Sequence, residues 1–129
     1  MTERPCPFCE RIAVGKVEAE SRLAVAFPDG FPVSNGHFLV VPRRHEADFF
    51  ALTQAEQEDM LAVARDVQSL LRSQHNPAGF NVGINVGTAA GQTVGHAHLH
   101  LIPRYSGDVP DPRGGVRWVI PTKAPYWER

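Results

Sequence analysis

Alternating histidines occupy the segment His96-Ala97-His98-Leu99-His100-Leu101-Ile102, which holds three of the chain's six histidines. Successive side chains of an extended strand point to opposite faces. The histidines therefore share one face of a predicted strand, and the small and aliphatic residues between them share the other, as expected for packing on a core. Three imidazoles in register can form a hydrogen-bonded relay, a metal site, or a nucleophile with supporting groups.

The approach to this strand is rich in glycine, with the sequence Gly91-Gln92-Thr93-Val94-Gly95. Such a loop leaves backbone N–H groups free to face an anion. A cluster of structural histidines is the alternative interpretation. The combination of histidines with an anion-binding loop favours phosphoryl or nucleotidyl transfer.

Length and charge limit the class of protein. The 129 residues predict a single domain, residues 1–129, with a hydrophobic core. Thirteen basic against fourteen acidic residues give a net charge of −1, which disfavours a nucleic-acid-coating protein. The sequence has no long apolar run for a membrane span and no signal-peptide core at its start. We therefore expect a cytoplasmic protein, in which two cysteines are thiols or metal ligands rather than a disulfide.

The remaining pattern predicts an α+β fold with an antiparallel sheet. Strands are expected over residues 22–27, 37–41 and 80–86. Thr53 and Glu56 form a capping-box pattern for a long helix that ends near residues 73–76. Its apolar stripe at helical spacing should be core: Met60, Val63, Ala64, Val67, Leu70 and Leu71.

The strand expected over residues 80–86 has two unlike faces. Phe80, Val82, Ile84 and Val86 share one face, while Asn81, Gly83 and Asn85 share the other. The connection to the histidine strand is long enough to reach over a ligand. The tail, residues 106–129, is loop-rich with short apolar and aromatic segments, and either docks on the domain or lines a cleft or subunit interface.

A second group of candidate ligands begins with Cys6 and Cys9, the C-x-x-C spacing that lets two thiolates bind one zinc ion. A tetrahedral site needs two further ligands, for which histidines are the plausible source. His45 follows a predicted strand and His96 opens the triad segment, whereas His75 near the helix end is expected to be a solvated surface residue.

At these residues the chain resembles the histidine triad family of nucleotide hydrolases and transferases. The family hallmark, three histidines alternating with hydrophobic residues and followed by two hydrophobics, stands here at residues 96–102. The similarity extends to residues 91–94, 37–45 and 26–29 and covers about residues 6 to 104. It implies a two-layer domain with a five-stranded antiparallel sheet, one long and one short helix, and usually a homodimer.

The resemblance also implies residue roles. His98 would attack the α-phosphorus of a purine nucleotide or dinucleotide and form a covalent nucleotidyl-histidine, with His100 on the phosphate oxygens. His96 and Gln92 would complete the catalytic set, with Gln92 near the leaving oxygen. The substrate would be contacted by His98 and His100 together with Asp29, Asn85, Gln92 and Thr93.

Family members that carry the N-terminal cysteine pair hold a structural zinc. Mapped onto this sequence, the ligands are Cys6, Cys9, His45 and His96, with residues 1–10 as the zinc-binding segment. Four protein ligands leave no open position for catalysis.

The branch of the family is less sharply indicated. Residues 91–94 and 101–104 resemble dinucleoside polyphosphate hydrolases, which we favour, whereas residues 6–9 and 41–45 resemble adenosine 5′-phosphoramidases. A nucleotide-binding module with weak turnover is a further alternative. A nucleotidyltransferase acting on a sugar phosphate would need an acceptor site, for which the chain is short.

Overall fold

The computed structural model describes residues 5–128, so residues 1–4 of the expected zinc-binding segment and residue 129 of the tail lie outside it. Two α-helices, five strands and four 3₁₀ helices are present in the described residues. In chain order they are α1 (Pro7–Ala13), β1 (Ala19–Glu20), β2 (Ala24–Pro28), β3 (Phe38–Pro42), η1 (Phe49–Ala51), α2 (Gln54–His75), β4 (Gly79–Ile84), η2 (Thr88–Ala90), β5 (Leu99–Arg104), η3 (Gly115–Val119) and η4 (Tyr126–Glu128).

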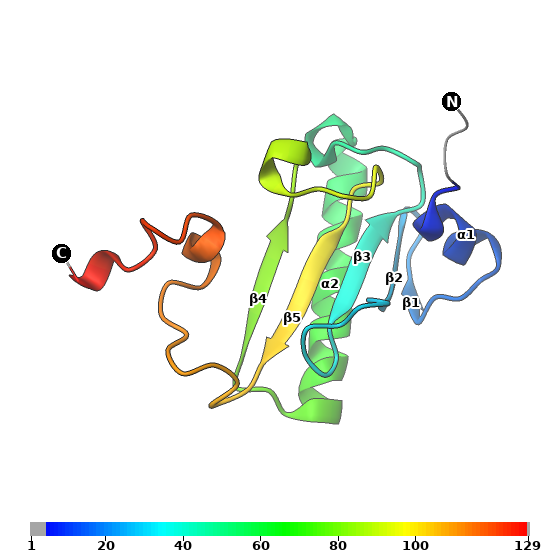
Figure 1. The fold of residues 1–129 in the computed structure, drawn as a ribbon. Coiled ribbons are helices and arrows are strands. Elements are labelled where there is room, and N and C mark those ends of the chain that lie inside the picture. Colours follow the sequence, from blue (N-terminus) through cyan, green and yellow to red (C-terminus); the bar gives the residue numbers. More distant parts are fainter. Residues whose placement is uncertain (1–4, 129) are drawn as a thin grey trace.

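The strands form one antiparallel sheet in the order β1-β2-β3-β5-β4 (Figure 1). The chain passes from β3 through α2 to the edge strand β4 and returns as β5 between them. This arrangement confirms the expected α+β fold with a five-stranded sheet. The two-residue strand β1 was not located from the sequence pattern, because it is too short to carry a periodicity.

The long helix α2 begins and ends where the sequence predicts. The Thr53 side chain accepts a hydrogen bond from the Glu56 amide, and the Glu56 carboxylate accepts one from the Thr53 amide, so the capping box is complete. At the other end Asn76 adopts a left-handed conformation, φ 48°, just before Pro77.

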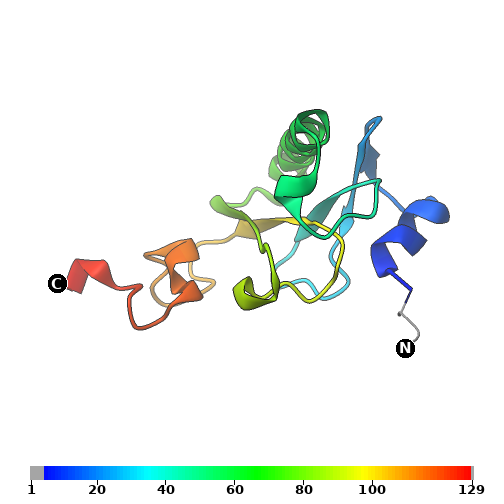
Figure 2. The same ribbon diagram turned by 90° about the horizontal axis from the view of Figure 1, so that it is seen from above.

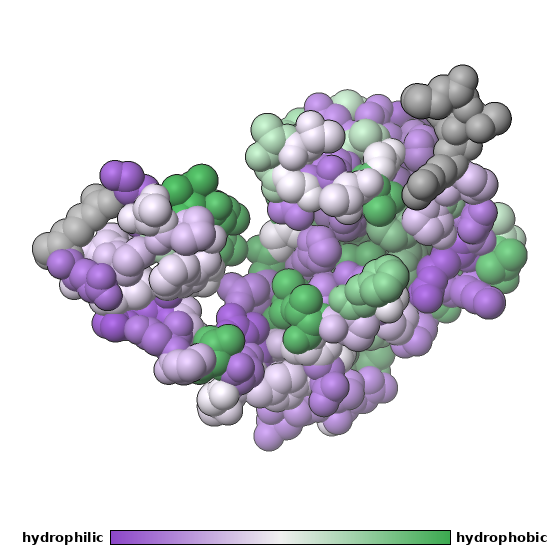
Figure 3. Space-filling view, viewed as in Figure 1, coloured by the Kyte–Doolittle hydropathy of each residue, from purple (hydrophilic) through white to green (hydrophobic). Residues whose placement is uncertain are grey.

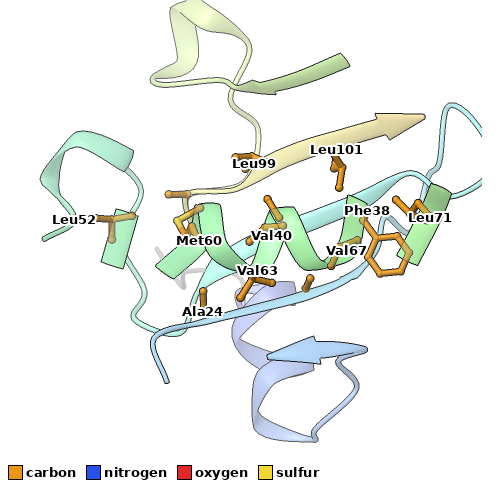
Figure 4. Close-up of a cluster of buried hydrophobic side chains, with 13 residues drawn as sticks. Ala24, Phe38, Val40, Leu52, Met60, Val63, Val67, Leu71, Leu99 and Leu101 are labelled. Carbon is orange, nitrogen blue, oxygen red and sulfur yellow. The ribbon is translucent and has the colours of Figure 1, made fainter. Parts of the chain in front are cut away.

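Helix α2 covers one face of the sheet (Figure 2). Side chains of β2, β3 and β5 interdigitate there with its apolar stripe (Figure 4). Leu70 was predicted as core but is 40% exposed, because it lies beside the stripe that meets the sheet. The remaining predicted stripe is buried: Met60, Val63, Ala64, Val67 and Leu71.

The opposite face of the sheet is covered only in part. Phe8 of α1 packs there with Phe27 of β2 and Leu39 of β3. In the described part of the chain no α-helix covers β4 and β5 on this face, and the tail lies beside them, beyond the sheet edge (Figures 1 and 2). None of the described helices is both long and apolar enough to cross a membrane.

Strand β4 is shorter and less buried than predicted. It ends at Ile84, so Val86 lies outside it, and Val82 is 48% exposed. The cause is position: β4 is an edge strand, where a residue of the apolar face is only partly covered by its neighbours. Phe80 and Ile84 of the same face do pack against the core.

The histidine segment is only partly strand. β5 begins at Leu99, so His100 lies in the sheet while His96 and His98 lie in the irregular segment that leads into it. The ladder to β3 stops at the Val40–Leu99 pair. Beyond it the backbone bonds elsewhere: the Ala97 amide donates to the Glu46 carbonyl at 2.6 Å.

Glu56 also links α2 to the loop that carries His45. It accepts hydrogen bonds from Arg44 Nη2 at 2.9 Å and Nε at 3.1 Å, and these contacts, followed by those of Thr53, lower the pKa of Glu56 to about 2. Since the pKa is lower in the folded chain than in the unfolded one, this stabilisation is complete above about pH 4.5 and is lost as pH falls toward 2.

We predict that Glu56→Gln lowers the free energy of unfolding by about 2 kcal/mol at pH 7, since it removes a buried charge-assisted contact and weakens the cap. The difference from the natural chain should shrink below pH 4.5. Urea unfolding at pH 7, 4 and 2.5 measures it. Glu58→Gln, an exposed position on the same helix, is the control. A constant difference at all three values would contradict the assignment.

Candidate functional site

A cleft of about 500 Å³ opens on the sheet face opposite α2, between α1 and the start of β5. It brings together five of the residues expected to bind substrate or to react: Asp29, Asn85, Thr93, His98 and His100. Apolar walls come from α1, β2 and β3, through Phe8, Phe27 and Leu39. The cleft therefore combines an apolar side, suited to a flat base, with an imidazole cluster.

His98 has one nitrogen fixed and one available. Its Nδ1 lies 2.8 Å from the carbonyl oxygen of His96, so Nδ1 carries the proton and donates. In the neutral ring Nε2 then keeps its lone pair. The ring packs edge-on against Phe8, with centroids 5.1 Å apart, and lines the cleft. The hydrogen bond thus selects Nε2 as the nucleophilic nitrogen of the neutral ring.

His100 belongs to a relay with His37 and Asp29. The Val33 amide donates to His37 Nδ1 at 3.1 Å, which places the proton of neutral His37 on Nε2. That Nε2 lies 3.0 Å from His100 Nδ1 and 3.3 Å from Asp29 Oδ2. His100 accepts at Nδ1 and so carries its own proton on Nε2, where it can donate to a phosphate oxygen.

The electrostatics of the relay favour neutral rings. Burial lowers the pKa of His37, opposed by the Asp29 charge. Burial likewise lowers the pKa of His100, helped by the neighbouring His98 and His37. Both shifts preserve the neutral tautomers that the hydrogen bonds require.

His96 is fully buried and does not line the cleft. Its Nε2 lies 2.7 Å from the Pro42 carbonyl oxygen, so Nε2 carries the proton, and Nδ1 presents a lone pair to Cys6, Cys9 and His45. Both nitrogens are therefore in use, and the structure places His96 in a supporting position rather than at the cleft.

The four predicted zinc ligands converge. Sulfur-to-nitrogen distances are 3.4 Å for Cys6–His96, 3.3 Å for Cys9–His45 and 3.5 Å for Cys9–His96, and the two Nδ1 atoms are 3.3 Å apart. A tetrahedral zinc ion, with bonds of about 2.3 Å to sulfur and 2.0 Å to nitrogen, sets neighbouring ligand atoms about 3.3–3.8 Å apart. The four donor atoms fit such an ion, and the Pro42 carbonyl supplies the hydrogen bond that orients His96.

Asp29, His37 and His100 also lie close enough to suggest a metal site, with donor atoms within 4.8 Å of one another. The tautomer of His37 argues against one. A ring whose Nδ1 accepts from the Val33 amide must carry its proton on Nε2, the atom that faces the other two groups. This trio is a hydrogen-bonded relay.

The side-chain amide of Gln92 bonds to the backbone of its own loop and to that of Ala47. Its Oε1 accepts from the Gly87 amide at 2.9 Å, and its Nε2 donates to the Ala47 and Val94 carbonyls at 2.8 and 3.0 Å. The side chain braces the loop over the cleft, while its neighbour Thr93 lines the cleft. The structure does not bring Gln92 to the cleft lining.

The lining residues that the sequence did not identify include Phe8, Arg11, Phe27 and His37. His37 stands just before β3, and it meets His100 because Leu39 pairs with His100 in the sheet. Only the strand register, which no local pattern reveals, could have identified it. Arg11 lies over the Phe27 ring, 4.7 Å from its centroid, so its stem and charge border the apolar wall.

A histidine whose Nδ1 is bound to a carbonyl and whose Nε2 is left to react, a second imidazole that donates, and an apolar wall suit attack on a nucleotide phosphorus. Comparison with known proteins agrees with this chemistry: the model of the HIT domain matches residues 14–107. The chain belongs to the HIT domain family.

Three relatives illustrate the range of the family. An uncharacterized HIT-like protein of Mycoplasma genitalium is 38% identical over 81% of this chain and 76% of its own. An AP-4-A phosphorylase of Mycobacterium tuberculosis is 36% identical over 73% of this chain and 49% of its own. An asymmetrical bis(5′-nucleosyl)-tetraphosphatase of Schizosaccharomyces pombe is 38% identical over 78% and 56%. This chain thus spans about half the length of the two relatives with a named activity.

Solved structures share the fold. A HIT family protein of Bacillus anthracis superposes with a TM-score of 0.72 at 40% identity, covering 83% of this chain and 78% of that one. A zinc-bound histidine triad family protein of Mycobacterium smegmatis gives a TM-score of 0.70 at 33% identity, covering 88% and 89%.

We predict the tautomers at pH 7: His98 protonated on Nδ1, and His37 and His100 on Nε2. Long-range ¹H–¹⁵N correlation spectra of the histidine side chains report them directly. Because the pKa values of His37 and His100 are lowered, their rings should stay neutral as pH falls through about 6.5 and charge only in more acidic solution. A His98 ring protonated on Nε2 alone would contradict its role as a nucleophile.

Proposed function

We propose that this protein hydrolyses dinucleoside polyphosphates, such as diadenosine tri- and tetraphosphate, through a covalent nucleotidyl-histidine at His98. The observation that carries the proposal is the fixed tautomer of His98, whose Nδ1–H is bound to the His96 carbonyl while Nε2 remains free at the cleft. In this tautomer Nε2 attacks through its own lone pair, so the step needs no separate base.

The reaction takes two displacements. His98 Nε2 attacks the α-phosphorus, forming an N–P bond as the P–O bond to the leaving phosphate breaks, and the leaving oxygen departs with the electron pair. Water then attacks the same phosphorus, losing its proton to solvent, and the N–P bond breaks to return His98 and release the nucleoside monophosphate. His100 Nε2–H donates to a phosphate oxygen throughout, and the Asp29 carboxylate is placed at the cleft to accept from ribose hydroxyls.

The lack of a proton donor for the leaving group at His96 and Gln92 favours a polyphosphate leaving group. Neither nitrogen of His96 is available to donate a proton into the cleft, and the amide of Gln92 is held by backbone. A nucleoside polyphosphate is stable as an anion near pH 7, since its last ionisation lies near pH 6. An amine leaving group must be protonated as it departs, so hydrolysis of a P–N bond, the second candidate activity, makes the greater demand on this site.

The family supports the reaction class. As a HIT family member, the chain is a nucleotide hydrolase or transferase. The phosphorylase and the tetraphosphatase among its relatives differ in whether phosphate or water accepts the nucleotidyl group, and here we propose water.

We predict that His98→Ala lowers turnover of diadenosine tetraphosphate by at least about 10³-fold while AMP binding persists, because the nucleophile is lost and the cleft is retained. Product analysis with diadenosine tri- and tetraphosphate and adenosine 5′-phosphoramidate measures it. His75→Ala, at an exposed position, is the matched control.

The relative rates on these three substrates test whether the chain is a polyphosphate hydrolase or a phosphoramidase. Faster P–N cleavage would replace the polyphosphate proposal with the phosphoramidase. Nucleotide binding without turnover of any of the three would favour a binding module, and equal turnover by the natural chain and His98→Ala would remove His98 as the nucleophile.

We further propose that Cys6, Cys9, His45 and His96 hold one structural zinc ion. The support is the convergence of two sulfurs and two Nδ1 atoms described above, with four protein ligands and no open position for substrate. Bound there, the ion would join α1 to the end of β3 and to the triad segment.

Protein purified without an affinity tag should contain about one zinc per chain, and Cys9→Ser should lose it. Because metal binding is coupled to folding, the variant should unfold with several kcal/mol less stability. Elemental analysis and urea unfolding measure the two effects, with His75→Ala as the histidine control. Absence of metal from the natural chain would refute the site.

A further inference from the structure

The nucleotide cleft does not end at His100. A second depression of about 290 Å³ continues from it and shares Val33, His37, Asn85 and His100 with it. A third, of about 430 Å³, shares Val33, Asn81, Ile102 and Val116 with the second. Together they form one groove that crosses β5 and β4 from the cleft to the tail. Figure 3 shows this face of the molecule, hollowed between the tail and α1.

The floor of the groove is set by strand alternation. His100, Ile102 and Arg104 share one face of β5. Opposite His100 and Ile102, β4 presents Gly83 and Asn81. An added Cβ at Gly83 would meet no atom within 4 Å, so this glycine leaves the floor open beside His100.

The far end of the groove is electrically neutral. Arg104 is the cation there, and Asp108 binds it with two hydrogen bonds of 2.7 and 2.8 Å, while Asn81 Oδ1 accepts a third from Nη1 at 2.7 Å. The remaining lining is mainly aliphatic and includes Val116 of the tail. Arg104 therefore has little positive charge to offer a terminal phosphate.

We propose that this groove, hereafter the distal groove, binds the uncharged far end of the leaving group, namely the second nucleoside of a dinucleoside polyphosphate. The inference rests on the proposed function, because the first nucleotide must sit in the cleft for the leaving group to point past His100. Aliphatic side chains suit the faces of a base or sugar, and the amides of Asn81 and Asn85 suit their polar edges. Val116 makes the tail the outer wall of the groove.

The test measures binding, so that it is independent of turnover. In the His98→Ala background, affinities for AMP, ATP and diadenosine tetraphosphate are compared by calorimetry. We expect the dinucleotide to bind about tenfold or more tightly than AMP, since it adds contacts beyond the cleft, and more tightly than ATP, whose far end is charged. Val116→Trp fills the distal groove and should abolish this advantage.

Matched variants separate the outcomes. Val119→Trp places the same ring on an exposed position of η3 outside the groove lining and should keep the dinucleotide advantage. Gly83→Val obstructs the floor from the sheet side and should also reduce the dinucleotide advantage. It is a second groove variant that leaves the tail unchanged. Equal affinity for AMP and the dinucleotide, an equal or higher affinity for ATP, or an advantage unchanged in both groove variants would each overturn the inference.

Failure of the proposed function gives a different result. If AMP itself does not bind, the nucleotide cleft is wrong and the distal groove falls with it. If AMP binds without a dinucleotide advantage, the cleft stands and only the distal groove is refuted.

Discussion

The site depends on the way His96 is held. Its ring donates from Nε2 to the Pro42 carbonyl, and its own backbone carbonyl accepts from His98. One residue thus joins the end of β3, the cluster of Cys6, Cys9 and His45, and the proposed nucleophile His98. Because the segment from His96 to His98 lies outside the sheet ladder, these bonds replace the strand pairing that would otherwise position it. A shift of the His96 carbonyl would remove the acceptor that keeps the proton of His98 on Nδ1. Nε2 would then no longer be fixed as the nitrogen that carries the lone pair.

Four histidines with the same ring acquire three roles from their hydrogen-bond partners. A carbonyl oxygen at one nitrogen forces that nitrogen to donate, and so leaves a lone pair on the other, the proposed metal ligand in His96 and the proposed nucleophile in His98. An amide at Nδ1 has the opposite effect in His37, which becomes a donor to His100. Proximity alone groups Asp29, His37 and His100 as readily as the zinc ligands, and only the direction of each bond separates a relay from a metal site.

Local sequence patterns were sufficient for much of this fold. The capping box at Thr53 and the stop before Pro77 place α2, and the alternation of the histidine segment identifies His98 and His100, which line the cleft. Features that depend on strand pairing could not be predicted from local sequence patterns. The short strand β1 has no periodicity, the exposure of Val82 follows from its place at the sheet edge, and His37 reaches the relay through strand register. The convergence of Cys6 and Cys9 with two distant histidines was reached through family resemblance, since spacing fixes only the cysteine pair.

The tail explains why the sheet keeps an open groove. Its side chains pack on one another: Arg113 lies over the ring of Trp127 at 4.6 Å, Arg117 over that of Tyr126 at 4.7 Å, and Trp118 Nε1 donates to the Arg113 carbonyl at 2.8 Å. Gly114 allows this packing, since its φ is 95° and a Cβ would approach Trp127 to 3.2 Å. Large hydrophobic residues of the tail, Val116, Val119 and Ile120, are exposed rather than packed on the sheet, and the tail contacts β4 through η3. Because the tail packs on itself, the face of the sheet stays uncovered. Val116 lies at the border of the groove, where a leaving group of suitable length would meet it.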